Sequence, residues 1–116
     1  VASLREKNEC MALATLLQTH TKLHTLYLPS TIFDIEGMHD LGVAVASSQL
    51  LRNLYLHHND MCDEGVDVLT RSLMHSSTLQ TLDLSGNPSI TTRGWQTLST
   101  LLTAPNSNLK VLYLND

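Results

Sequence analysis

The hydrophobic positions of this chain follow a pattern of leucines that occurs four times. Each copy has leucines at its first, fourth and sixth positions, and the copies begin at Leu23, Leu51, Leu79 and Leu109, which are 28, 28 and 30 residues apart. Residues two positions apart in a strand point to the same face. Each copy therefore predicts a short strand with its leucines buried, and the regular period indicates a repeat architecture.

The segments between these strands have the spacing of amphipathic helices. After the second motif, Val66, Leu69 and Leu73 are three and four positions apart, which predicts one buried stripe of a helix. Parallel strands need a long crossover, usually a helix, so we expect strand and helix to alternate. The predicted buried columns are Cys10, Met38, Val66 and Trp95; Leu13, Leu41, Leu69 and Leu98; and Leu17, Val45, Leu73 and Leu102.

Strand and helix spacings predict how such units stack. Neighbouring strands lie about 4.8 Å apart, whereas helix axes need about 8–10 Å. The helical side must be longer, so the stack curves. We predict an α/β fold, a leucine-rich repeat solenoid forming a horseshoe segment with a concave parallel sheet and convex helices.

One array accounts for the whole chain, 1–116. No segment resembles the polar cap that solenoids need at their ends, so we expect a fragment of a longer array. Its predicted parts are a helical half-repeat at 1–22, full repeats at 23–50, 51–78 and 79–108, and a final strand at 109–116.

Two asparagines occupy the ninth position of their motifs, Asn59 and Asn87. The chain turns there, and a buried turn needs its backbone polar groups satisfied. An amide side chain can bridge the N–H and C=O groups of adjacent turns. We therefore expect the asparagines to join neighbouring repeats, with one donor lost where Thr31 takes this position in the first repeat.

The residues from Asn59 to Leu69 follow the pattern Asn-x-Met-Cys-Asp-Glu-Gly-Val-x-x-Leu. With the period near 28, this pattern resembles the ribonuclease-inhibitor-like class of leucine-rich repeats. The class includes ribonuclease inhibitors, the sensor ends of nucleotide-binding immune receptors and activators of Ran-type GTPases, and its members are mostly intracellular.

The resemblance implies a protein–protein interaction scaffold that binds a protein partner on its concave face. Two alternatives stay open: the regulatory part of a GTPase-activating protein, and the ligand-sensing array of an intracellular immune receptor. The resemblance names no partner, and it transfers the fold and the generic role alone.

Charge and composition narrow the classes of partner. Seven Lys and Arg stand against eleven Asp and Glu, giving a net charge of −4, which argues against a nucleic-acid partner. No run approaches the roughly 18 apolar residues of a membrane span, so we expect no membrane partner. Two cysteines are too few for a disulfide framework, which favours a reducing, cytoplasmic location.

All three tyrosines stand at one motif position, between the two inward leucines. Their side chains should project from the concave sheet. Tyrosine is a good strand former and is also enriched in binding hot spots, so structural and binding roles are both open. The predicted partner-binding residues are Tyr27, Tyr55, Asp83, Tyr113, Asn53, His57 and Thr81.

The segment from His57 to Asp63 is the one stretch whose side chains could carry metal chemistry. Imidazole, thiolate and carboxylate are zinc ligands, but their spacing here matches no established site. A nucleophilic Cys62 would need a pocket and an orienting group, which a smooth sheet does not offer. We expect no catalytic residue, no metal and no cofactor, and therefore no enzyme.

Acidic residues gather near the predicted helix starts, where the helix dipole favours them. Capping and solubility explain most of this, and an acidic rim for a basic partner is the alternative. Trp95 sits in a core column, and we interpret it as a packing residue. The acidic residues are Asp34, Glu36, Asp40, Asp60, Asp63, Glu64 and Asp67.

Overall fold

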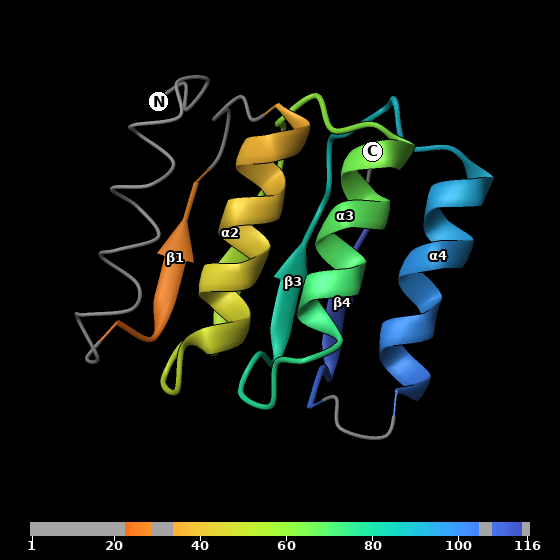
Figure 1. Cartoon of the computed structure of the whole chain (residues 1–116). Coiled ribbons are helices and arrows are strands. Elements are labelled where there is room, and N and C mark those ends of the chain that lie inside the picture. Colours follow the sequence, from red (N-terminus) through yellow and green to blue (C-terminus); the bar gives the residue numbers. More distant parts are fainter. Residues whose placement is uncertain (1–22, 29–33, 105–107, 115–116) are drawn as a thin grey trace.

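Two layers make up the computed structural model, which describes residues 23–28, 34–104 and 108–114 (Figure 1). A four-stranded parallel sheet forms one layer, and three helices cover one of its faces. The elements in chain order are β1 (Thr25–Tyr27), α2 (Ile35–Ser47), β2 (Asn53–Tyr55), α3 (Asp63–Leu73), β3 (Thr81–Asp83), α4 (Thr92–Thr103) and β4 (Val111–Tyr113).

The strands lie in the order β1-β2-β3-β4, and every neighbouring pair is parallel. Their register aligns the fourth leucine of each motif, so that Leu26, Leu54, Leu82 and Leu112 form one row. The predicted strands, helices and parallel pairing are therefore confirmed for the described residues. The expectations for 1–22, Thr31 and Phe33 lie outside those residues.

Local sequence explains where the helices begin. Asp34 is the N-cap of α2, and its carboxylate accepts a hydrogen bond of 2.7 Å from the Gly37 amide. This bond satisfies one of the amides that a helix start leaves without an intrahelical partner. Helix α3 begins with Asp63 and Glu64 and carries Arg71 in its last turn, which complements the helix dipole at both ends.

The core lies between the sheet and the helices and consists mainly of the predicted leucines. The central strands contribute Leu54, Leu56, Leu82 and Leu84, all fully buried. Trp95 is partly buried and packs against this core, which confirms its packing role. Burial of a large aliphatic side chain contributes about 1.5–3 kcal/mol, so these columns supply most of the hydrophobic stabilisation.

Two leucines that were expected in the core are exposed. Leu114, just past the end of the edge strand β4, is 38% exposed, because no described strand pairs with β4 on its outer side. Leu102 was expected in the buried stripe of its helix, but it is 52% exposed, and Leu101 is buried instead. Among the described elements, α4 has a helix on one side only, namely α3. A helix at the edge of a layer buries a narrower stripe than one between two neighbours, so Leu98 and Leu101 fill the core and Leu102 stays outside.

Asn87 joins two neighbouring turns, as predicted. Its Oδ1 accepts hydrogen bonds from the Asn59 and Met61 amides, both 2.9 Å long. Its Nδ2 donates to the carbonyl oxygens of Leu56 at 3.2 Å and Leu84 at 2.9 Å. Asn87 is almost fully buried, so this amide satisfies backbone groups that water cannot reach.

Asn59 repeats half of this arrangement. Its Nδ2 donates to the Leu28 carbonyl oxygen at 3.0 Å, while its buried Oδ1 has no hydrogen-bond partner among the described residues. Thr31, which takes this motif position in the first repeat, falls outside the described part of the chain.

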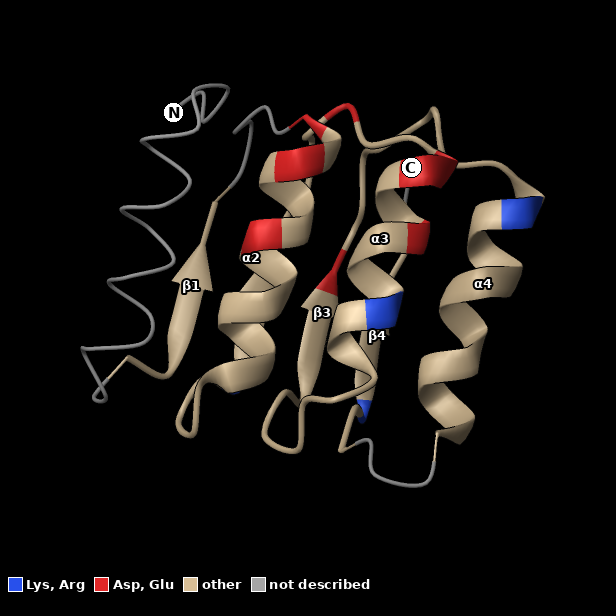
Figure 2. Ribbon diagram, in the orientation of Figure 1, with Lys and Arg blue, Asp and Glu red and all other residues tan. Residues whose placement is uncertain are grey.

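Carboxylates on the helix face also connect successive units. Figure 2 shows acidic positions at the start of α3 and a basic position at the start of α4. Asp63 accepts hydrogen bonds from the Thr91 amide at 2.8 Å and hydroxyl at 2.5 Å. Asp67 Oδ2 lies 2.9 Å from Arg93 Nη1. The Thr91 hydrogen bonds, aided by Arg93, hold the pKa of the Asp63 carboxyl below its ordinary value, because they favour its charged form.

None of the described helices is long and apolar enough to cross a bilayer. The longest, α2, has 13 residues, whereas a spanning helix needs about 20.

Candidate functional site

The sheet has one face that no described helix covers, and the tyrosine row lies on it. Parallel pairing places Tyr27 beside Tyr55, Tyr55 beside Asp83, and Asp83 beside Tyr113. Side chains of a strand alternate between faces, so residues next to the buried leucines must point away from the helices. We call this row of four residues, across all four strands, the open-face row.

Two of its tyrosines are the most exposed aromatic residues of the row. Tyr27 is 60% exposed and Tyr113 44%, while Tyr55 is half-buried. The rings of Tyr27 and Tyr55 have centroids 5.3 Å apart at an interplanar angle of 51°. This is a normal aromatic pair, and it accounts for the partial burial of Tyr55.

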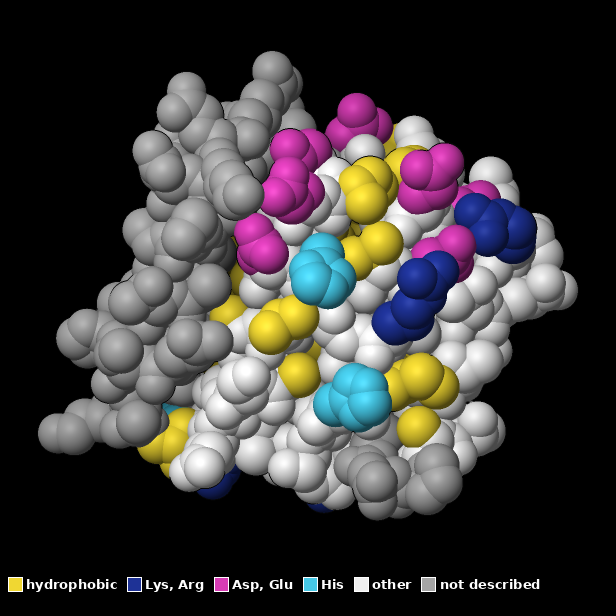
Figure 3. Space-filling model, viewed as in Figure 1, with side chains coloured by type: hydrophobic (Ala, Val, Ile, Leu, Met, Phe, Trp, Pro, Cys, Tyr) yellow, Lys and Arg dark blue, Asp and Glu magenta, His cyan; other side chains and the backbone are white. Residues whose placement is uncertain are grey.

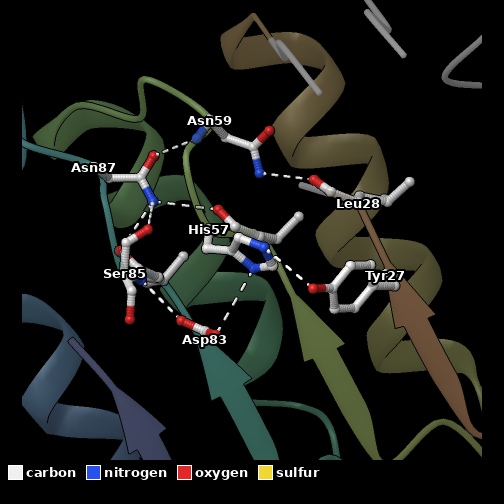
Figure 4. Close-up of polar contacts among 9 residues, drawn as sticks. Tyr27, Leu28, His57, Asn59, Asp83, Ser85 and Asn87 are labelled. Atoms are coloured by element: carbon white, nitrogen blue, oxygen red, sulfur yellow. Dashed lines mark hydrogen bonds and ion pairs between the residues drawn. The ribbon is translucent and has the colours of Figure 1, made fainter. Parts of the chain in front are cut away.

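His57 follows Tyr55 by two positions and lies on the same face. Its ring meets that of Tyr27 edge-on, with centroids 5.1 Å apart, and the Tyr27 hydroxyl is 3.4 Å from His57 Nε2. The imidazole thus lies between Tyr27 and Asp83 (Figure 4). The sequence predicted an exposed His57, but its side chain is only 19% exposed, because these neighbours enclose it.

Asp83 is the charged member of the open-face row. Its Oδ1 accepts a hydrogen bond of 2.9 Å from the Ser85 amide, and its Oδ2 lies 3.7 Å from His57 Nδ1 (Figure 4). That separation is too long for a hydrogen bond. His57 Nδ1 is accordingly a buried atom without a hydrogen-bond partner in the described residues.

The hydrogen-bonding roles of the two His57 nitrogens depend on where the ring carries its proton. Nε2 accepts from the Tyr27 hydroxyl when it has no proton and donates to the hydroxyl oxygen when it has one.

A second row lies two positions earlier on the same face. Thr25, Asn53, Thr81 and Val111 are paired in register, and Asn53 Nδ2 donates to Thr25 Oγ1 at 3.1 Å. Thr25 and Val111 are exposed and the other two half-exposed. All seven predicted partner-binding residues thus lie on one face. Six of them belong to the two rows, and His57 lies two positions beyond Tyr55.

The turn after β2 holds a feature that the sequence did not indicate. His58 and Gly86 occupy the same motif position, and both have left-handed backbones, with φ of 58° and 70°. An added Cβ at Gly86 would lie 2.5 Å from the His58 ring. The His58 side chain therefore lies over Gly86, and its ring stacks edge-on against His57 at 5.4 Å.

Metal and nucleophile chemistry find little support in this geometry. No group of three or more His, Cys, Asp or Glu in the described ranges is placed to hold a metal ion. Cys62 is exposed at the N-cap of α3. On the open face, the hydroxyl beside the His57–Asp83 contact is that of Tyr27, which lies 3.4 Å from His57 Nε2.

The helix face is hollowed between α2 and α3. The hollow is a groove of about 490 Å³, and Figure 3 shows two histidines and apolar side chains on that face. Arg71 lines it as well, while the nearby Asp67 is occupied by Arg93. Its lining residues are His39, Val43, Ala46, Ser47, Val68, Arg71, Ser72 and His75.

Comparisons with known proteins give no family for this chain. No protein-family model matches the sequence, and no curated protein matches it at a significant level. The function of the chain is therefore inferred from its own geometry.

Proposed function

We propose that this chain is a segment of a leucine-rich repeat solenoid of the ribonuclease-inhibitor-like type, and that it binds a protein partner on the open face of its sheet. On this proposal the segment is a non-enzymatic interaction scaffold that needs no cofactor. The observation that carries it is the open-face row, in which a carboxylate stands among three tyrosines on a face that no described helix covers.

The parallel sheet with helices on one side supports the solenoid. Each unit packs on its neighbours, through strand pairing, helix packing and the Asn87 bridge. Nearest-neighbour packing of this kind is what defines a repeat protein. Because strands are spaced more closely than helices, further units of the same type would curve the open face inward.

Exposed aromatic side chains support the binding role. Hot spots of protein interfaces are enriched in tyrosine, and surrounding polar residues exclude water from them. Tyr27 and Tyr113 expose large apolar rings at either end of the row, and the threonines and Asn53 provide a polar surround. A core function alone does not account for tyrosines that remain 60% and 44% exposed.

The test is a pull-down from cell extract with the wild-type chain and a Tyr27→Ala/Tyr55→Ala/Tyr113→Ala variant. Circular dichroism and a urea midpoint first establish that both chains are folded. A matched control removes apolar surface from the helix face, where Val43 is 42% and Leu102 is 52% exposed. The control variant is Val43→Ser/Leu102→Ser.

We expect partners that the wild type and the control both retain and the tyrosine variant loses. That outcome would place binding on the open face. Loss in the control variant alone would contradict the proposal and assign binding to the helix face. Identical partners for all three chains would also contradict it, because the tyrosines would then be structural.

A further inference from the structure

The open-face row contains two different aromatic arrangements. Tyr27 and Tyr55 are on adjacent strands, and their rings touch. Tyr55 and Tyr113 are separated by one strand, and Asp83 lies between them in register. The rings of the first pair are in contact with each other, whereas the second pair lies on either side of a carboxylate.

The spacing of the second pair suits one flat group. Neighbouring strands lie about 4.8 Å apart, so Tyr55 and Tyr113 start from backbones about 10 Å apart. A planar group between two rings needs about 7–8 Å, twice the contact distance of carbon atoms. The backbone spacing of Tyr55 and Tyr113 is therefore compatible with a single planar layer between their rings.

The charge at the bottom of this gap defines the chemistry of the occupant. Asp83 is the only Asp, Glu, Lys or Arg among the outward positions of the four described strands. Its Oδ1 is engaged by the Ser85 amide, while Oδ2 has only the imidazole of His57 at 3.7 Å. Neither Arg52 nor Lys110, which precede β2 and β4, forms an ion pair with Asp83 in the described structure.

We propose that Asp83, Tyr55 and Tyr113 form a site for an arginine side chain of the protein partner. The guanidinium is planar and cationic, stacks on aromatic faces and donates to carboxylates in a fixed geometry. Asp83 Oδ2 accepts its N–H group, and the tyrosine rings contact its two faces. An ammonium group carries the same charge but lacks the flat shape, so lysine binds this site less well than arginine.

This inference rests on the proposed function for its biological partner, but the site itself can be tested without one. The probe is Nα-acetyl-arginine amide, titrated into the ¹⁵N-labelled full chain and followed by two-dimensional NMR. Nα-acetyl-citrulline amide has the same planar shape without the charge and serves as the matched probe. Nα-acetyl-lysine amide has the charge without the plane.

We expect saturable shifts of the Tyr55, Asp83 and Tyr113 amides with the arginine probe. Its affinity should exceed that of the citrulline probe about tenfold, because citrulline keeps the plane and N–H donors but loses the positive charge, and with it the ion-pair and cation–π contributions. The lysine probe should fall between the two. Equal affinity for arginine and citrulline would overturn the inference.

Two variants test whether Asp83 causes the preference for arginine over citrulline. Asp83→Asn retains an oxygen for the Ser85 amide and should lose the preference for arginine over citrulline. Asp67→Asn removes a carboxylate that pairs with Arg93 on the helix face and should leave the preference unchanged. An arginine preference that survives Asp83→Asn would overturn the assignment of Asp83.

The aromatic contribution is tested at Tyr113, which is exposed and lies on an edge strand of the described sheet. Tyr113→Phe keeps the ring and should keep the arginine preference, while Tyr113→Leu should reduce it. A preference equally weak in both variants would contradict the stacking. If no probe shows a preference while the tyrosine variant still loses its partner, the arginine site fails and the proposed function stands.

Discussion

The turn after each strand and the open face of the sheet use polar residues in opposite ways. At the turn, Asn87 is buried, and its amide makes hydrogen bonds with five different backbone groups of two neighbouring units. On the open face, Asp83 makes one hydrogen bond, to Ser85, and faces an imidazole that is too distant for another.

The difference indicates which polar residues hold the fold and which are available to a partner. A buried amide whose hydrogen-bonding capacity is used internally has none left for a ligand. A partly exposed carboxylate with a free acceptor gains interactions when a cationic group arrives. Substitutions should therefore lower stability at the turn and alter binding at the open face.

The largest expected effect is at Asn87. Asn87→Ala should lower the free energy of unfolding by about 1–3 kcal/mol, since it leaves buried amides and carbonyls without partners. Urea unfolding measures this change. The control is Asn53→Ala, which removes an amide of the open face that bonds only Thr25 and should cost less than about 0.5 kcal/mol. Equal midpoints for the two variants would contradict the comparison.

The second-largest expected loss of stability is at Gly86. Gly86→Ala places a Cβ at positive φ and 2.5 Å from the His58 ring, so we expect a loss of about 2 kcal/mol. Adding His58→Ala removes the steric conflict and should restore about half of that loss, leaving the backbone term. Thermal or urea unfolding of the single and double variants provides the test. No recovery in the double variant would rule out the contact between His58 and Gly86.

The Asp63 carboxylate should make the stability of the fold depend on pH. Its pKa is lowered in the folded chain by hydrogen bonds from Thr91. A lowered pKa means that Asp63 stabilises the fold above its unfolded pKa of about 3.9, and that this contribution is lost as pH falls through the folded value. Asp63→Asn should therefore be less stable than wild type at pH 7, and the difference should shrink below about pH 4. A difference independent of pH would contradict the role of the carboxylate charge.

The smallest effect is expected on the open face itself. Tyr113→Thr keeps a good strand former and removes an exposed ring, so the free energy of unfolding should change by less than about 0.5 kcal/mol. Chemical unfolding checks this value. A loss above about 1 kcal/mol would make Tyr113 a structural residue and weaken its assignment to binding.

Much of the fold follows from the spacing of a few residue types. The leucine period predicted the four strands, their parallel register and the intervening helices, because burial and strand alternation leave few other solutions. Asn87 was predicted from its motif position together with the need of a buried turn for hydrogen bonds. The exposure of Leu102 was not predicted, because the burial of an edge helix depends on how many neighbouring helices it has.

The open face was predictable in outline and not in detail. The sequence placed the tyrosines and Asp83 on one face, since each lies between two inward leucines. It could not show that His57 reaches between Tyr27 and Asp83, because that contact depends on side-chain torsions. The sequence also did not predict the left-handed backbone of His58, since histidine rarely adopts a positive φ. Asp67 pairs with Arg93 of the next helix, a contact between elements that residue spacing along one helix does not indicate.

The most direct test of the open face as the binding surface is photo-crosslinking from single positions. A photoreactive phenylalanine analogue would replace Tyr113 on the open face or, as the matched control, Leu102 on the helix face. The account predicts a protein adduct from position 113 that excess wild-type chain suppresses and the triple tyrosine variant does not. Adducts from position 102 alone, or equal suppression by both competitors, would contradict it.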